Sequence, residues 1–285
     1  MLYDGTWRES VNAGKAKDIK LAGKAILLNR HRAEGPIPPV RARWVDTSIN
    51  PKRIAFQSLK KLGIDVRRSR RHPTLIDFIE NRGVKVVYDV GANVGQFGIG
   101  LRQRGYDGKI FSFEPVKSAF DALKSAAATD GNWNVLQCAV GSEAGEVWVN
   151  VSANTQFSSI KSLSEKAASI DPNSGIVGRE KVVCANLDEL AASQGPTLIK
   201  IDTQGFEREV LKGATRALSQ AVGVFMELPI IDIYDDSWSF LEAIRTMDEL
   251  GFVPCQIDPV NHHQADCMAA IEFDCLFRRE ADGID

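Results

Sequence analysis

The segment VKVVYDVGANVGQ, residues 84–96, contains the pattern that decides the fold. Val84 to Val90 is a nearly continuous apolar run, typical of a parallel strand covered by helices on both faces. The run passes directly into a turn that contains Gly91 and Gly95. Glycine permits positive φ there, and the missing side chain lets a ligand approach the backbone and the helix amides that follow. The segment therefore predicts a strand, a ligand-binding turn and a helix that extends to Arg104.

Strands and helices alternate along most of the remaining chain. The further predicted strands are KIFSFEP (109–115), WNVLQCAV (133–140), TLIKIDTQG (197–205), VGVFMEL (222–228), FVPCQI (252–257) and EFDCLFRR (272–279). The further predicted helices are TLIDFIENRG (74–83), with a left-handed end at Gly83, then 116–128, 206–221 and about 238–250. Repeated units of this length predict an α/β fold, a doubly wound and mostly parallel sheet of about seven strands with helices on both faces.

Two regions depart from this alternation. Residues 147–183 separate the third and fourth predicted strands and contain VWVNV, the polar run NTQFSSIKS and a Pro/Asn/Gly stretch. An insertion of this length beside the carboxyl edge of a sheet predicts a lid or a substrate-binding loop. Residues 1–72 show weak periodicity and contain the proline-rich run GPIPPVR, so we interpret them as a partly irregular or helical extension before a domain at 73–285.

Lys and Arg concentrate in the first part of the chain. Within a formal net charge of −2, residues 1–82 hold 18 Lys and Arg against 8 Asp and Glu, and the remainder holds 17 against 29. A basic segment can bind nucleic acid, an anionic lipid or a phosphorylated glycan carrier. We favour neutralisation of the acidic remainder, within one chain or across a homodimer, and expect no nucleic-acid partner.

Several classes of protein are disfavoured by composition. No run approaches the roughly 20 apolar residues of a membrane span, and the N-terminus lacks an apolar signal core, so we expect a cytoplasmic protein without such a span. The five cysteines are odd in number and scattered, which argues against a disulfide framework or a zinc site. The carboxylates of Asp202, Asp232, Asp235 and Asp236 are conceivable oxygen ligands for magnesium, but IYDDSW (233–238) equally resembles a helix start with acids in its first turn, and we expect no metal.

An acid follows the glycine turn at the distance typical of nucleoside sites. Glu114 lies 19 positions after Gly95, near the roughly 20 expected for a residue that accepts hydrogen bonds from ribose hydroxyls. The alternative is an exposed acid at a strand end before Pro115. A nicotinamide fingerprint would require glycine where Asn93 stands, so dinucleotide binding and an oxidoreductase are disfavoured. An Asn side chain suits an amino acid moiety, as in S-adenosylmethionine, better than a pyrophosphate.

Four motifs together carry a resemblance to a known family. They are D-V-G-A-N-x-G (89–95), F-E-P (113–115), A-V-G (139–141) and I-K-I-D-x-x-G-x-E-x-x-V-L-K-G (199–213). In this order they resemble FkbM-family methyltransferases, over a stretch from about Leu62 to Arg279. The resemblance implies a class I methyltransferase sheet with its last strand antiparallel, S-adenosylmethionine as cofactor, and methylation of a hydroxyl group on a sugar, lipid or other natural product. Many relatives have D-V-E-G where this chain has Asp202-Thr203-Gln204-Gly205, and the neutral Gln204 excludes a base or strong metal ligand there.

The resemblance implies that Gly91, Ala92, Asn93, Gly95 and Gln96 hold the methionine end of the cofactor, that Glu114 holds the ribose and that Ala139 lies near the adenine. Further site residues are expected from their chemistry and their positions in the sequence. Those expected to bind the cofactor are Asp89, Gly91, Ala92, Asn93, Gly95, Gln96, Glu114, Pro115, Ala139 and Asp202. Those expected to contact the acceptor, which we interpret as a small molecule, glycan or glycolipid, are Ser158, Ser159, Gln204 and His262. The cofactor residues fall at the carboxyl ends of adjacent predicted strands, where ligands of doubly wound sheets bind.

Methyl transfer to oxygen requires removal of a hydroxyl proton, and three candidates for the base stand in the sequence. Asp202, at the end of the fourth predicted strand, is the first, although it could instead cap a helix or bind the cofactor amine. Glu227, at the end of the fifth, is the second. The pair His262 and His263 falls in a polar stretch that we interpret as an exposed loop. A catalytically silent nucleoside-binding or scaffolding module is the alternative to an enzyme, favoured by the neutral Gln204.

Overall fold

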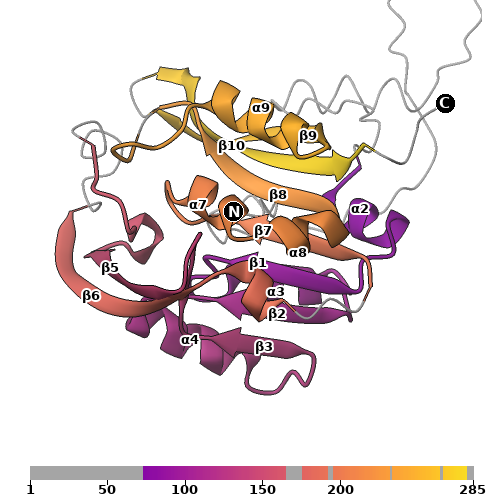
Figure 1. The fold of residues 1–285 in the computed structure, drawn as a ribbon, viewed down its shortest axis with the longest axis horizontal. Coiled ribbons are helices and arrows are strands. Elements are labelled where there is room, and N and C mark those ends of the chain that lie inside the picture. The colour runs from indigo at the N-terminus through magenta and orange to yellow at the C-terminus, as the bar shows by residue number, and fades with distance from the viewer. Residues whose placement is uncertain (1–72, 165–174, 192–194, 232, 264–265, 281–285) are drawn as a thin grey trace, which may run out of the picture. The chain divides into compact units, whose positions relative to one another are not determined.

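The computed structural model describes residues 73–164, 175–191, 195–231, 233–263 and 266–280 (Figure 1). Seven strands form the main sheet in the order β3-β2-β1-β7-β8-β10-β9. Their bounds are β1 Val86–Val90, β2 Lys109–Phe113, β3 Trp133–Leu136, β7 Thr197–Ile201, β8 Ala221–Pro229, β9 Phe252–His263 and β10 Asp266–Arg279. β10 runs antiparallel to β8 and β9, and the other neighbours are parallel. The predicted seven-stranded α/β sheet with an antiparallel last strand is confirmed.

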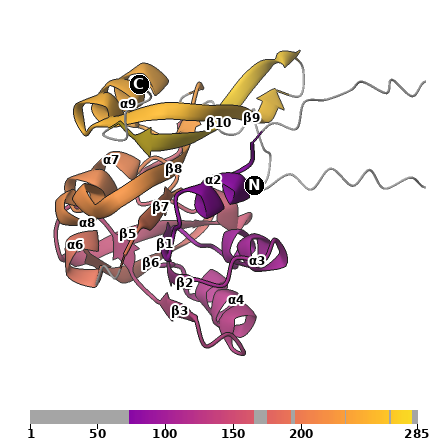
Figure 2. The same cartoon turned by 90° about the vertical axis from the view of Figure 1, so that its right-hand side faces the viewer.

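Helices cover both faces of this sheet (Figure 2). α2 (Leu75–Asn81), α3 (Gln96–Gln103) and α4 (Lys117–Ala127) pack on one face, and α6 (Leu187–Leu190), α7 (Glu207–Lys212), α8 (Thr215–Gln220) and α9 (Phe240–Glu249) on the other. Side chains of β1 alternate between the two cores: Val87 faces the α3 side, and Tyr88 faces the α8 side. Burial on both faces explains why this strand is apolar almost throughout.

Residues of the predicted insertion form a second sheet. β5 (Gly145–Ser152) and β6 (Ile176–Ala185) pair antiparallel, and the short β4 (Ala139–Val140) joins β6, giving the order β4-β6-β5. The expectation of a lid or loop over the whole of 147–183 is therefore wrong for these paired segments. After β5, residues 155–160, which begin with the 3-10 helix η1 (Thr155–Phe157), line the cavity described below.

The segment WNVLQCAV was expected to be one strand, and the structure divides it. Trp133–Leu136 pairs with β2 in the main sheet, whereas Ala139 and Val140 pair with Cys184 and Ala185 of β6 in the second sheet. Both parts are apolar, so the sequence carries no sign of the break. The change of partner strand is a tertiary feature.

The helix predicted over 206–221 is also divided, into α7 and α8. A Cβ on Gly213 would lie 2.0 Å from the carbonyl oxygen of Gly141, so this close backbone approach requires glycine. Asp188 then starts α8, because its carboxylate accepts hydrogen bonds from the amides of Arg216 and Ala217 at 2.9 and 2.8 Å. Packing against the second sheet's loop thus interrupts a segment with continuous helical periodicity.

The first helix of the described residues begins and ends as the sequence predicts. α2 begins with a capping box between Thr74 and Asp77, and Gly83 after it has the expected positive φ, of 60°. The expected basic extension, residues 1–72, lies outside the described residues. Among the helices that are described, none combines the length and the apolar character that crossing a membrane requires.

Candidate active site

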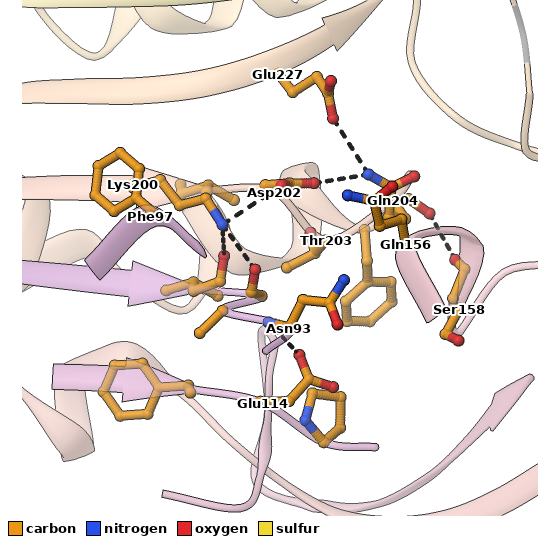
Figure 3. A pocket seen from close by; sticks show the side chains of 18 of the residues that line it. Asn93, Phe97, Glu114, Gln156, Ser158, Lys200, Asp202, Thr203, Gln204 and Glu227 are labelled. Carbon is orange, nitrogen blue, oxygen red and sulfur yellow. Dashed lines mark hydrogen bonds and ion pairs between the residues drawn. The ribbon is translucent and has the colours of Figure 1, made fainter. Parts of the chain in front are cut away.

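A cavity opens at the carboxyl ends of the strands (Figure 3). One side, here called the nucleoside half, is lined by the turn after β1 and by the ends of β2 and β4: Gly91, Ala92, Asn93, Gln96, Glu114, Pro115 and Ala139. The opposite side, here called the carboxylate half, is formed by residues that follow β7, by the end of β8 and by the middle of β10: Asp202, Gln204, Glu227, Glu272 and Asp274. The segment after β5 supplies a further wall, with Thr155, Gln156, Phe157, Ser158 and Ser159.

The turn after β1 depends on glycine at its first position. Gly91 has φ +73°, and a Cβ there would lie 1.8 Å from the carbonyl oxygen of Asp202, so β7 can approach the turn only if position 91 lacks a side chain. The amides of Gly91 and Ala92 donate to the Phe113 carbonyl at 3.0 Å each. Because β2 already engages these amides, the turn presents the side chains of Asn93 and Gln96 to the cavity instead.

Glu114 ends β2 as a buried carboxylate. It accepts hydrogen bonds from the amides of Asn93 and Val116, both at 2.8 Å, which ties the end of β2 to the turn after β1. Burial raises the pKa of Glu114 to about 7, even though both amides favour the charged form. Each carboxylate oxygen retains acceptor capacity, so the group is suited to a ligand that brings hydrogen-bond donors such as a pair of hydroxyls.

A charged network lies beneath the nucleoside half. Asp89, Lys200 and Ser112 are register partners on adjacent strands. The Lys200 ammonium lies 3.2 Å from the Asp89 carboxylate, and the Ser112 hydroxyl donates to the same carboxylate at 2.9 Å. Asp89 is fully buried by these contacts and does not line the cavity, so the expectation that it binds the cofactor directly is not supported. Lys200 also donates to the Gly91 carbonyl at 2.7 Å and thereby braces the turn.

Asp202 and Glu227 meet through Gln204. The Gln204 amide donates to the Asp202 carboxylate at 2.7 Å and to the Glu227 carboxylate at 3.2 Å (Figure 3). Burial opposes the charge on Asp202, but the nearby Lys200 ammonium and the Gln204 amide outweigh it and lower the pKa of Asp202. Burial and then the Asp202 charge raise the pKa of Glu227 well above its ordinary value. The pKa values of these two neighbouring carboxyl groups are therefore shifted in opposite directions, and Glu227 is the weaker acid.

The loop that carries Gln204 is held from several directions. Gln204 has φ +55°, a left-handed conformation unusual for a residue with a side chain. Its side-chain oxygen accepts from the buried Tyr234 hydroxyl at 2.6 Å, and its carbonyl accepts from the Ser159 hydroxyl at 2.5 Å. The Glu207 carboxylate accepts from the amides of Thr203 and Gly205, at 3.0 Å each. These contacts fix the Gln204 side chain between the two carboxylates.

Two acids of β10 join the carboxylate half and were not predicted from the sequence. Glu272 and Asp274 lie two residues apart and therefore on one face of the strand, and Asp274 is the register partner of Glu227. Burial raises the pKa of Glu272 to about 7 and that of Asp274 to about 6. The signal that could have found them is the alternation of acids and apolar residues in EFDC, which aims both acids at one face.

The structure gathers most of the expected site residues at this cavity, with three exceptions. Those at the cavity are Gly91, Ala92, Asn93, Gln96, Glu114, Pro115, Ala139, Ser158, Ser159, Asp202, Gln204 and Glu227. Asp89 lies beneath it, as described above. Gly95 faces the core, because a Cβ there would meet Leu123 at 3.0 Å. His262 is exposed within β9 and does not line the cavity; the expected loop is a strand, and it is the adjacent Asn261 that reaches the site.

The strand order, with the antiparallel β10 between β8 and β9, and the glycine turn beside a buried acid after β2 define an α/β protein with the class I methyltransferase fold. Residues 89–254, more than half of the chain, match the model of the methyltransferase FkbM domain. The chain belongs to the FkbM methyltransferase family. All four motifs that carry the resemblance, from Asp89 to Gly213, lie inside the matched region.

The chain is also similar to a curated protein and to several solved structures. The hexuronic acid methyltransferase AglP of Haloferax volcanii is 29% identical over 147 residues, which cover 50% of this chain and 55% of the relative. The chain thus spans about half the length of this relative. A TehB-like SAM-dependent methyltransferase from Corynebacterium glutamicum has 12% identity and a TM-score of 0.39 over 80% of this chain and 96% of that one. TehB from Haemophilus influenzae has 8% identity and a TM-score of 0.42 over 78% and 65%.

Proposed function

We propose that this methyltransferase moves a methyl group from S-adenosylmethionine to a hydroxyl group of a sugar, glycolipid or other natural-product acceptor. The observation that carries the proposal is one cavity with the nucleoside half on one side and, on the other, two carboxylates that Gln204 bridges by hydrogen bonds. A cofactor site and a proton acceptor are the two parts that methylation of a hydroxyl requires.

The nucleoside half has the chemistry that S-adenosylmethionine requires. The buried Glu114 carboxylate suits the two ribose hydroxyls, and the side chains of Asn93 and Gln96 suit the methionine end. Pro115 and Ala139 offer apolar surface to the adenine. When bound, the cofactor supplies an electrophilic methyl group on a sulfonium.

Asp202 is the proposed base. Lys200 keeps it ionised, Gln204 fixes its orientation, and it stands at the boundary between the two halves of the cavity. The acceptor oxygen forms its bond to the methyl carbon as the bond from that carbon to sulfur breaks, and the hydroxyl proton passes to the Asp202 carboxylate. Glu227, with its raised pKa, suits a role in positioning the acceptor.

A sugar acceptor is supported by two observations. The carboxylate half is rich in hydrogen-bond acceptors, which match the hydroxyl donors of a carbohydrate ring. The curated relative is named for methylation of a hexuronic acid, which is also a sugar. Ser158 and Ser159, in the wall formed by the segment after β5, are proposed to complete the acceptor site.

The test compares Asp202→Asn with Glu227→Gln, and uses Asp121→Asn on the exposed face of α4 as the control. Asp202→Asn keeps the shape but removes the basicity, so we expect turnover to fall by about 100-fold or more while cofactor affinity changes little. Turnover is measured as demethylated cofactor released with a panel of glycosides, and affinity by calorimetry. Loss of affinity together with turnover would make Asp202 a cofactor ligand. Full activity in Asp202→Asn would move the assignment to Glu227.

A further inference from the structure

The carboxylate half has an unusual balance of charge. Four acids line it, Asp202, Glu227, Glu272 and Asp274, whereas Lys200 supplies the only Lys or Arg side chain among the described residues that line the cavity. Charge of one sign in a low-dielectric pocket selects strongly among ligands. The question is therefore whether Lys200 could receive an anionic group of the acceptor.

The geometry of Lys200 excludes that use. Its ammonium has three N–H donors, and it contacts the Gly91 carbonyl at 2.7 Å, the Asp89 carboxylate at 3.2 Å and the Asp202 carboxylate at 3.4 Å. The side chain is 7% exposed and lies against the Phe97 ring. All of its donors are directed at this chain's own oxygens, so among the described residues that line the cavity an acceptor's carboxylate would find no Lys or Arg side chain to pair with.

The Gln204 amide is engaged in the same way. Its two N–H groups point to Asp202 and Glu227, and the Tyr234 hydroxyl donates to the Gln204 side-chain oxygen. The strongest donors near the two carboxylates are thus used within the protein. What this part of the wall offers a ligand is carboxylate oxygen, which requires a ligand that donates hydrogen bonds.

The acids of the carboxylate half are close together although their mutual repulsion and their burial destabilise the fold. Glu227 lies directly opposite Asp274 in the β8–β10 pair, and like charges at such positions destabilise a sheet. Glu272 is on the same face of β10 and is nine-tenths buried. Several acids held together at a cavity, where apolar residues would be more stable, indicate a functional constraint.

We propose that the carboxylate half binds an uncharged, polyhydroxylated ring through hydroxyl donors to Glu227 and Glu272, and that it rejects a ring that carries a carboxylate there. This inference rests on the proposed methylation of a sugar and names the kind of sugar. A second carboxylate in this half would meet like charge without a compensating donor, so a uronate should bind at least about tenfold more weakly than the matching neutral sugar.

The experiment measures binding of matched methyl glycosides to the full chain loaded with S-adenosylhomocysteine. Calorimetry compares methyl glucoside with methyl glucuronide, and methyl galactoside with methyl galacturonide, at about pH 8, which is above the pKa values of about 7 for Glu272 and about 6 for Asp274. We expect the neutral member of a pair to bind at least about tenfold more tightly. Glu272→Gln removes one charge and should narrow that ratio, whereas Glu249→Gln, exposed on α9, should leave it unchanged.

Three other outcomes would refute the charge selection, its origin in the carboxylate half, or the sugar acceptor itself. If the uronate binds as tightly as the neutral sugar, or more tightly, the charge selection is refuted while a sugar acceptor stands. If the ratio is present but Glu272→Gln leaves it unaltered, the carboxylate half is not its source and the inference fails. If neither member of either pair binds, both the sugar acceptor and the selection are refuted.

Discussion

Binding of S-adenosylmethionine is expected to depend on pH through Glu114. Burial raises the pKa of this group to about 7 in the free protein, from an ordinary 4.5. Ribose hydroxyls that donate to the carboxylate favour its charged form, so the bound state has a lower pKa and binding below pH 7 releases a proton. The sign follows directly: affinity increases as the pH rises towards about 7 and is constant above it.

The magnitude follows from the same two values. If binding returns the Glu114 pKa to 4.5, affinity at pH 5.5 should be about 20-fold weaker than at pH 7.5. Near pH 6 the protein should release about 0.9 proton for each cofactor bound, and above pH 8 almost none. Calorimetry in two buffers with different ionisation enthalpies counts these protons directly.

Glu114→Gln is the matched control, because it keeps the shape of the side chain and cannot ionise. We expect it to bind at least about tenfold more weakly at pH 7.5, since charge-assisted hydrogen bonds to the ribose are lost, and to show a shallower dependence on pH. Glu272 and Asp274 also titrate in this range but are present in both proteins, so the difference between the two profiles isolates Glu114. Identical pH profiles would refute the assignment of the ribose to Glu114.

Three further predictions concern the supports of the site. Gly91→Ala places a Cβ 1.8 Å from a backbone oxygen of β7 and should abolish cofactor binding; Gly83→Ala has positive φ but no atom within 4 Å and should cost only about 1 kcal/mol in chemical denaturation. If both variants lost cofactor binding equally, the positive φ, and not the close approach to the Asp202 carbonyl, would be the reason that position 91 requires glycine. Lys200→Met leaves a buried aspartate unpaired and should lower the free energy of unfolding by about 3–5 kcal/mol, against less than about 1 kcal/mol for the exposed Lys212→Met. A loss for Lys200→Met as small as that for Lys212→Met would show that the ion pair is not structural. Thr155→Val removes the 3.1 Å hydrogen bond from the Thr155 hydroxyl to the Asn93 side chain in the turn after β1 and should weaken cofactor binding about fivefold, as measured by calorimetry. Unchanged affinity would show that η1 does not support the cofactor site.

The sequence by itself determined the order of strands and helices, because each β-α unit carries its own local pattern. The apolar run 84–90 was predicted to be a strand covered on both faces, and the structure shows it so. The turn predicted directly after it begins at Gly91, which has a positive φ. Glu114 was identifiable from its distance to that turn, since strand and helix lengths in such a unit allow little variation. Local periodicity and spacing suffice for features that depend on neighbouring segments.

Tertiary structure alone decided the features that depend on which distant segments meet. Ala139 leaves the main sheet because β6, far along the chain, supplies its partner, and Gly213 breaks a periodic helix because the Gly141 carbonyl approaches it. The motif suggested that Asp89 binds the cofactor. In the structure, strand register places Lys200 beside Asp89, and the Asp89 carboxylate pairs with this ammonium beneath the cavity. The same register sets Glu227 opposite Asp274. Pairing across a sheet is a long-range property, and no local pattern of residues encodes which side chain will stand opposite another.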